Sequence, residues 1–259
     1  MKKILLSFAL TVGLLTSAST AMAQTVNMNS YITLTVTDGA AIKLDFVAAA
    51  AATPVRIVSG SNTQDITVGT GWYDGNNPST FTVTAAASTM TIYGNLTGFA
   101  CSNNGARITA LDVSNNTLLT QLYCGSNNLS SLDVLQNTQL AWLYCYSNKL
   151  SSLDISKNTK LTLLDCQYNQ LSSLDLSKDT ALTLLGCSGN QRLTTLDVSK
   201  NTKLMLLWCF NGKLSNLDVS SCKKLEELRC YNNELTSLNV NGCVNLTEIR
   251  CYGNKLTTL

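Results

Sequence analysis

The sequence predicts a β-solenoid, a coil of stacked turns with a parallel β-sheet along one wall. One motif of about 21 residues recurs eight times between residues 96 and 259. In each copy, buried-type and outward-type residues alternate, which is the period of a strand with one buried face. The rest of each copy is short and rich in Asn, Ser, Thr and Lys, which form turns rather than helices. Such repetition is typical of folds in which each unit packs only on its neighbours.

Residues 1–23 have the features of a secretory signal peptide. Two lysines precede an apolar run over residues 4–15, and residues 21–23 (Ala-Met-Ala) form a small-x-small cleavage sequence. Cleavage after Ala23 predicts an exported mature chain that starts at Gln24. The apolar run is too short to span a bilayer, and no longer one follows. We therefore predict a protein that is secreted or displayed on the cell surface, with no transmembrane segment.

The charge balance excludes several classes of protein. Of 18 Lys and Arg residues, two lie in residues 1–23, which leaves 16, equal to the 16 Asp and Glu residues. A neutral mature chain lacks the positive charge that binds nucleic acid or an anionic membrane surface. The absence of His excludes Ser-His-Asp and Cys-His catalysis and His-ligated metal sites. No nucleophile paired with an acid or base stands out, so we predict neither an enzyme nor a bound cofactor or metal.

Residues 24–95 differ from the repeats and predict a small β-rich domain. They are rich in Thr, Val and Ala, alternate over 31–36 and 81–84, and are punctuated by Pro54 and Pro78. An open solenoid end exposes apolar core and a free sheet edge. We therefore expect this domain to cap the N-terminal end of the coil and to join the first repeat near Leu96 without a linker.

Eight cysteines mark the repeats over residues 96–259. They follow one another at 21 residues, apart from one step of 23 and one of 22. The extra residues come after Asn104 and after Asn190, in the turn behind the cysteine, where a loop absorbs them. The eight are Cys101, Cys124, Cys145, Cys166, Cys187, Cys209, Cys230 and Cys251.

The repeated pattern is L-x-x-L-x-C-x-x-N-x-L-x-x-L-D, as in the unit that starts at Leu140. It resembles the leucine-rich repeat, with Cys in the third apolar position. The 21-residue length and the cysteine position are similar to the cysteine-ladder repeats of internalin J-type bacterial surface proteins. This resemblance implies a leucine-rich-repeat solenoid with its parallel sheet on the concave face, and a role in adhesion or protein recognition. On the convex side we expect extended chain or 3₁₀ turns.

Two polar residues recur at fixed positions. An asparagine three residues after the cysteine is predicted to bond the backbone of its turn, and Gly212 breaks that series at the turn we expect to be least well fixed. An aspartate also recurs once per repeat, at the start of a turn. Two roles are open for its carboxylate: binding calcium between turns, or accepting hydrogen bonds from the backbone N–H groups of its own turn. We favour the turns, because Asn239 continues the row and the Gly-rich calcium repeat is absent. The row comprises Asp112, Asp133, Asp154, Asp175, Asp197 and Asp218.

The eight repeat cysteines occupy a buried apolar position, so we predict free, buried thiols. Adjacent strands lie about 4.8 Å apart, but in-register parallel strands hold their Cβ vectors in a direction that fits a disulfide poorly. No C-x-x-C pair offers a zinc site. Cys222 and Cys243 stand in another position, held by asparagine in other units, and a disulfide between them stays open as an alternative.

Aromatic residues carry the prediction of function. Eight of the nine between Leu119 and Leu259 fall on outward strand positions. Cross-strand stacking is one interpretation. We favour a binding surface, because Trp, Tyr and Arg are typical of interaction hot spots and a long exposed apolar patch usually marks an interface. The predicted partner-binding residues are Tyr123, Trp142, Tyr144, Tyr146, Trp208, Phe210, Arg229, Tyr231, Arg250 and Tyr252.

The sequence thus predicts a secreted or cell-surface protein that binds a macromolecular partner, a protein in our first interpretation, through its concave sheet. One alternative is a carbohydrate-binding module, since Trp and Tyr also stack on sugars. Another is a structural spacer within a larger surface protein. The last unit stops at Leu259 with no capping segment, so we also expect either a fragment of a longer protein or self-association through this end.

Overall fold

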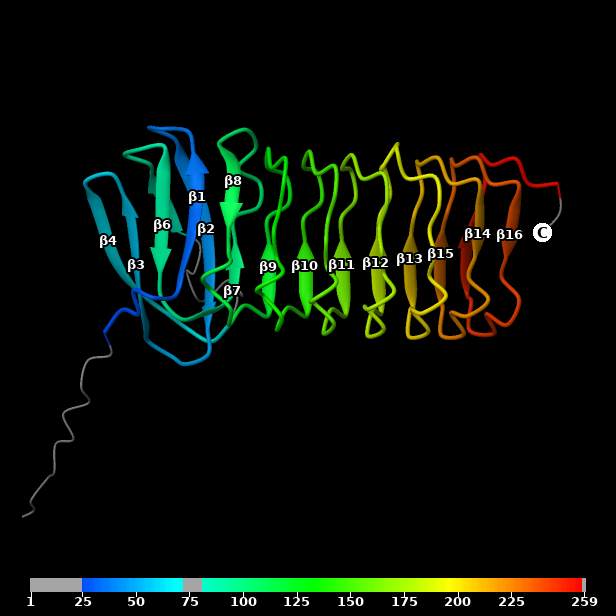
Figure 1. Cartoon of the computed structure of the whole chain (residues 1–259), viewed down its shortest axis with the longest axis horizontal. Coiled ribbons are helices and arrows are strands. Elements are labelled where there is room, and N and C mark those ends of the chain that lie inside the picture. The colour runs from blue at the N-terminus through cyan, green and yellow to red at the C-terminus, as the bar shows by residue number, and fades with distance from the viewer. Residues whose placement is uncertain (1–24, 72–80, 258–259) are drawn as a thin grey trace, which may run out of the picture.

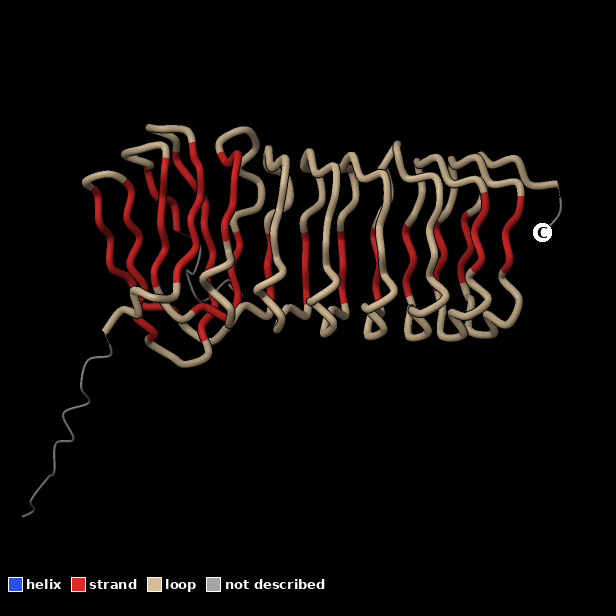
Figure 2. Tube along the Cα trace, in the orientation of Figure 1, coloured by secondary structure: helices blue, strands red, loops and turns tan. Residues whose placement is uncertain are grey.

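The computed structural model describes residues 25–71 and 81–257, and it forms an elongated coil with the repeat strands side by side (Figure 1). The predicted signal peptide and the terminal Leu259 lie outside these residues. Within them the chain consists of strands and turns and forms no helix, so no segment of the described chain is a candidate membrane-spanning helix. Figure 2 shows that the repeats are built of short strands joined by longer turn and loop segments.

Seventeen strands are found in the described residues. Before the repeats they are β1 (Tyr31–Val36), β2 (Ala41–Ala48), β3 (Thr53–Ser59), β4 (Asn62–Val68), β5 (Phe81–Thr84) and β6 (Thr89–Tyr93). The first repeat holds β7 (Leu96–Ala100) and β8 (Ile108–Asp112). In the later repeats they are β9 (Gln121–Tyr123), β10 (Trp142–Tyr144), β11 (Leu163–Asp165), β12 (Leu184–Gly186), β13 (Leu206–Trp208), β14 (Asn216–Asp218), β15 (Glu227–Arg229), β16 (Ser237–Asn239) and β17 (Glu248–Arg250).

The main sheet has ten strands in the order β17-β15-β13-β12-β11-β10-β9-β7-β2-β5. From β7 to β17 its pairs are parallel and in register, as the repeat predicts. On the opposite wall the chain is extended and turned, with only β14 and β16 paired among the described repeats. The expected convex side of extended chain and 3₁₀ turns is therefore confirmed. Bonds of the 3₁₀ type from residue i+3 to residue i, such as Asn158 N–H to Ile155 O (2.8 Å), recur in its turns.

The N-terminal strands continue both walls of the coil. Strand β2 pairs antiparallel with β7, the first repeat strand, and β1 pairs antiparallel with β8 on the other wall. Between these walls, Phe46 of β2 packs on Phe99 of β7 with ring centroids 5.9 Å apart. The hydrophobic core is therefore continuous across residue 96. The domain boundary that the sequence suggests there stays a prediction.

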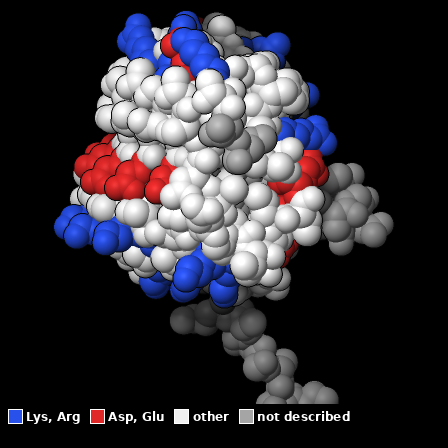
Figure 3. Space-filling model, turned by 90° about the vertical axis from the view of Figure 1, so that its right-hand side faces the viewer, with Lys and Arg blue, Asp and Glu red and all other residues white. Residues whose placement is uncertain are grey.

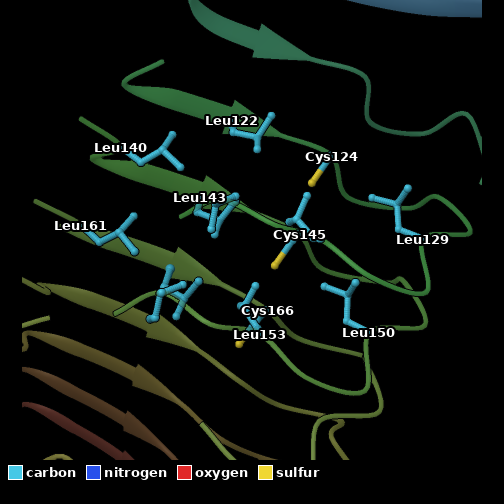
Figure 4. Packing of buried hydrophobic residues seen from close by; sticks show 14 of the residues in the cluster. Leu122, Cys124, Leu129, Leu140, Leu143, Cys145, Leu150, Leu153, Leu161 and Cys166 are labelled. Carbon is cyan, nitrogen blue, oxygen red and sulfur yellow. The ribbon is translucent and has the colours of Figure 1, made fainter. Parts of the chain in front are cut away.

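The repeat core is built of columns of like residues. Leucines and cysteines from successive turns lie one behind another, as Cys124, Cys145 and Cys166 do in Figure 4. All ten cysteines are free, including Cys222 and Cys243, which confirms the predicted free thiols. Seven of the eight repeat cysteines are buried as predicted, and Cys251, in the last turn, is half-buried. Burial raises the pKa of Cys124 to about 12, so the thiol stays protonated and behaves as a small apolar group.

The repeated asparagine side chain forms hydrogen bonds to the backbone of its own turn and of the preceding turn. Asn148 donates from Nδ2 to the carbonyl oxygens of Cys124 (2.9 Å) and Cys145 (3.1 Å), and its Oδ1 accepts the Leu129 N–H (3.0 Å). The aspartate row does what the turn interpretation predicts. Asp154 accepts the Ser156 N–H (2.9 Å), and this bond lowers the pKa of the carboxyl.

Candidate functional site

The concave wall presents three columns of outward side chains because its strands pair in register. The first column runs through Trp142, Leu163 and Leu184, which are direct partners on β10, β11 and β12. The second column contains the residue two positions later in each strand, and the third contains the residue after the cysteine. The sequence-predicted binding residues all belong to these columns, where they are exposed or half-buried.

The first aromatic group lies on β9, β10 and the turns that follow. The rings of Tyr123 and Tyr144 stack with centroids 4.6 Å apart and an interplanar angle of 10°. Tyr146 lies over Gly125, where a Cβ atom would be 2.6 Å from the ring. Trp142 is the most open member, with 38% of its surface exposed. The sequence predicted this grouping, and the glycine explains how the Tyr146 ring lies flat on the sheet.

The second aromatic group lies on β13, β15, β17 and the residues after their cysteines. Phe210 stacks on Tyr231 at 4.5 Å, and Tyr231 stacks on Tyr252 at 4.8 Å, both nearly parallel. Beside them the Trp208 indole N–H donates to Glu227 Oε1 (2.8 Å), and the Arg229 guanidinium lies over the Trp208 ring, 5.7 Å from its centroid. The cross-strand stacking considered for the sequence is therefore present in both groups.

Ion pairs connect the Glu and Arg side chains of β15 and β17 on this face. Arg229 pairs with Glu227 on its own strand and reaches Glu248 on the next at 3.9 Å, and Arg250 pairs with Glu248. Each of these pairs is partly open to solvent and contributes at most about 1 kcal/mol. Their main effect is to fix the orientation of the Arg side chains. Seen from the C-terminal end, acidic side chains gather mainly in two bands on opposite sides of the molecule (Figure 3).

A polar break separates the two aromatic groups, and the sequence pattern did not reveal it. Asp165 and Gly186 occupy the second column between Tyr144 and Trp208. Gln167 donates to Asp165 Oδ1 from its Nε2 (3.0 Å) and from its backbone N–H (3.2 Å). Burial raises the pKa of the Asp165 carboxyl. The signal that could have found this site is the interruption of this column by two residues that are neither aromatic nor basic, between Tyr144 and Trp208.

Of the nine aromatic residues between Leu119 and Leu259, Tyr168 is the one placed outside these columns, as the sequence indicates. It occupies a turn position with positive φ (53°), and its ring lies over Gly189, where a Cβ atom would be 2.4 Å from the ring. Its surface is 49% exposed. Within the described residues no cluster of three or more Cys, Asp or Glu side chains is arranged to hold a metal ion.

Comparison with solved structures supports the repeat assignment. The functional domain of InlJ from Listeria monocytogenes, which includes a cysteine ladder, is 37% identical over 68% of this chain and 44% of its own length, with a TM-score of 0.52. A leucine-rich-repeat protein of Leptospira interrogans is 26% identical over 56% of this chain and 40% of its own, with a TM-score of 0.53. No protein-family model and no curated protein matches the chain.

An internalin, InlF from Listeria monocytogenes, shares the fold at 19% identity, over 63% of this chain and 49% of its own length, with a TM-score of 0.59. The chain thus spans less than half the length of each of these three proteins. Its repeats form a leucine-rich-repeat solenoid with a cysteine ladder.

Proposed function

We propose that this leucine-rich-repeat solenoid is an exported binding protein that recognises a protein partner through its aromatic concave face, in adhesion or a related surface interaction. The observation that carries the proposal is the mode of ring packing on that face. Within each stack the rings cover one another's faces. What they offer to a partner is therefore mainly ring edges and tyrosine hydroxyls, together with the outer faces of the end rings.

This presentation suits a protein better than a sugar. A sugar packs on the face of an aromatic ring, and the inner faces of both stacks are occupied. Ring edges and hydroxyls instead suit the mixed apolar and hydrogen-bonding contacts of protein interfaces, in which Tyr, Trp and Arg dominate. The Leu163 and Leu184 side chains extend the half-buried apolar surface between the stacks. Trp142, whose ring is not in a stack described above, is where a glycan would bind if the alternative were correct.

The experiment begins with the intact chain carrying a photo-crosslinking residue in place of Tyr144, with the same residue at Tyr31 as control. Tyr31 belongs to β1 and pairs with Tyr93 at 5.7 Å, so it is a half-buried tyrosine away from the concave face. A protein crosslinked from position 144 and not from position 31 is then purified for affinity measurements. The same chain is applied to a glycan array.

The triple variant Trp142→Ala, Tyr146→Ala and Trp208→Ala should lose affinity for that protein at least about 100-fold, as expected for the loss of hot-spot side chains. A Tyr31→Ala variant should keep it. Specific binding on the glycan array that the triple variant loses would instead favour the carbohydrate-binding alternative. Unchanged affinity in the triple variant would contradict the proposed face, and a chain that binds neither class would behave as a structural spacer.

A further inference from the structure

The centre of the concave face holds an acidic group without an ion-pair partner, between the two aromatic groups. Asp165 is half-buried on β11, and its Oδ1 receives two bonds from Gln167. None of the ion pairs in the described chain includes it, whereas the neighbouring acids Glu227 and Glu248 both pair with arginine. A partly buried carboxylate without a cation is costly, and a partner that supplies one recovers that cost.

Gly186 leaves the position beside this carboxylate without a side chain. It lies in β12, directly between Asp165 and Trp208 in the register, and its φ is not among the positive values of the chain. The backbone therefore does not demand glycine here. A Cβ atom at this position would lie 2.9 Å from Gln167 Nε2 and 3.1 Å from Asp165 Oδ1. The position of the missing side chain is occupied by the end of the Gln167 side chain, whose Nε2 marks where a hydrogen-bond donor sits at the carboxylate. Because this end is flexible, a stronger donor from a partner can take its place.

Trp208 forms the other side of this position. Arg229 covers the Trp208 ring from the β15 side, in a cation–π contact with its guanidinium 5.7 Å from the centroid. Gly186 is its neighbour on the β12 side and contributes no side chain. One ring face is therefore occupied by a cation, and the opposite side faces Gly186, beside Asp165 and the Gln167 amide. The same ring, by symmetry of its quadrupole, attracts a cation on either face.

We propose that the protein partner inserts an arginine side chain at Gly186, where its guanidinium pairs with the Asp165 carboxylate and stacks on Trp208. This inference rests on the proposed function and names the chemistry of recognition at its centre. Arginine fits better than lysine because its planar fork donates to a carboxylate through two parallel bonds and stacks on an aromatic face. The pKa of Asp165, raised by burial, would fall when the cation binds.

The test uses a small probe and needs no identified partner. Nα-acetylarginine amide is titrated into the intact, isotope-labelled chain, and NMR follows the Asp165 carboxyl carbon, the Gly186 amide and the Trp208 indole N–H. We expect saturable shifts at all three sites and a fall in the Asp165 pKa. The citrulline analogue, which has the same shape without the charge, should produce neither.

Two variants and one control localise the effect. Asp165→Asn keeps the acceptor for Gln167 and removes the charge, and Gly186→Val fills the space with a side chain that suits a strand. Both should abolish the saturable shifts. Asp154→Asn alters an exposed carboxylate of the convex row and should leave them intact. Folding of each variant is checked by the unchanged amide spectrum of the other repeats.

Equal shifts from the citrulline analogue, or shifts retained in Asp165→Asn, would overturn the proposal. Shifts as large with Nα-acetyllysine amide would overturn the placement on Trp208, since an ammonium group does not stack as guanidinium does. The probe titration does not use the aromatic triple variant, which shares only Trp208 with this site, so the two tests can fail separately. The arginine site can fail while the concave face still binds its protein, and it can stand if that face proves to bind nothing else.

Discussion

Two columns of asparagine run through the repeats, and they use their side chains differently. The strand-side ladder follows the cysteines and comprises Asn104, Asn127, Asn148, Asn169, Asn190, Asn233 and Asn254. The convex-side ladder lies in the opposite turns and comprises Asn116, Asn137, Asn158 and Asn201, with Asp179, Cys222 and Cys243 in the same position. In both, Nδ2 donates to backbone carbonyls, as Asn158 does to Val134 and Asn137 (both 2.9 Å).

The difference lies in the side-chain oxygen. From Asn148 onward, the strand-side Oδ1 accepts a leucine N–H from the preceding turn, as Asn169 does from Leu150 (3.0 Å). In the convex-side ladder Oδ1 is buried without a hydrogen-bond partner in Asn116, Asn137, Asn158 and Asn201. The convex-side position therefore requires a side chain that donates a hydrogen bond and does not require one that accepts. A thiol meets that requirement: Cys243 Sγ lies 3.2 Å from the Val219 carbonyl oxygen, and Cys222 Sγ lies 3.7 Å from that of Val198.

Asp179 meets the requirement only when it is protonated. It is fully buried, and both carboxylate oxygens lack a partner. Burial raises its pKa to about 7, with a smaller contribution from the charge of Asp175. A protonated carboxyl donates one hydrogen bond in place of the amide, whereas the carboxylate donates none. The comparison of the two ladders thus predicts which substitutions each position accepts.

The largest expected effect is the loss of a strand-side asparagine. Asn169→Ala removes two bonds to carbonyls and leaves the Leu150 N–H without a partner. Asn158→Ala also removes two bonds to carbonyls, but it leaves no N–H unpaired. In both variants the carbonyls keep a second donor. At about 1 kcal/mol for each lost bond and about 2 kcal/mol for the buried unpaired N–H, we expect Asn169→Ala to cost about 4 kcal/mol and Asn158→Ala about 2 kcal/mol. Urea unfolding of the two variants measures the difference. Equal losses would mean that the acceptor of the strand-side ladder contributes nothing.

The next effect depends on pH and tests the donor requirement. Because the pKa of Asp179 is raised from 3.8 to about 7 in the folded state, the folded chain binds the proton more tightly than the unfolded chain. The contribution of Asp179 to stability is then greatest below pH 4, falls as the pH rises to about 7, and is level above that. Asp179→Asn should remove this dependence and stabilise the protein at pH 8 by on the order of 3 kcal/mol.

The matched control for that prediction is Asp175→Asn. Asp175 is exposed, and the bond from the Ser177 N–H lowers its pKa, so the sign of its contribution is opposite. Thermal unfolding is followed from pH 4 to pH 8 for the three proteins. A stability of Asp179→Asn that parallels the parent across this range would contradict a buried, protonated Asp179.

A smaller gain in stability is expected on replacing Cys222. Like Asp179, it is a fully buried residue that stands in place of asparagine in the convex-side ladder. Cys222→Asn restores an amide that donates to the Val198 and Asn201 carbonyls, each now 3.7 Å from the thiol sulfur. Because thiols are weak donors, the variant should be more stable by about 1 kcal/mol in urea unfolding. Cys222→Ala, which has no donor, should be less stable than the parent. If both variants behaved alike, the position would be set by volume rather than by donation.

The sequence predicted the solenoid, the in-register sheet and the buried thiols because the period of 21 residues repeats the same physical requirement eight times. It also placed Trp142, Tyr144 and their counterparts on one face, since alternation in a strand fixes the side on which a residue lies. The Asp165 site was not predicted, because it depends on where two unlike residues meet across strands. The ring stacking was foreseen only as an alternative, because spacing does not determine ring orientation.

Gly212 is a position at which the repeat pattern does not predict how the turn is hydrogen-bonded. The pattern indicates that an asparagine here would complete the strand-side ladder, and that its absence leaves the turn poorly fixed. The structure satisfies this turn differently. The preceding unit has an extra residue after Asn190, and the Leu193 N–H, which an asparagine side chain at this position would bond, already donates to the Asn190 carbonyl (3.1 Å). A Cβ atom on Gly212 would also lie 2.7 Å from Asn233 Oδ1.

The last predicted effect concerns the stability change on restoring the repeated asparagine at Gly212, which we expect to be unfavourable although the repeat pattern favours asparagine there. Gly212→Asn should lower stability by about 1 kcal/mol, because it crowds Asn233 and finds no free N–H to bond. The measurement is the urea midpoint, together with hydrogen exchange at the Leu214 N–H, which donates to Asn233 Oδ1 (3.1 Å) and should exchange faster. A stabilised variant would show that the consensus asparagine is favourable even after an insertion. The strand-side ladder would then tolerate turns of different length, and its contrast with the convex-side ladder would be weaker than the hydrogen bonds imply.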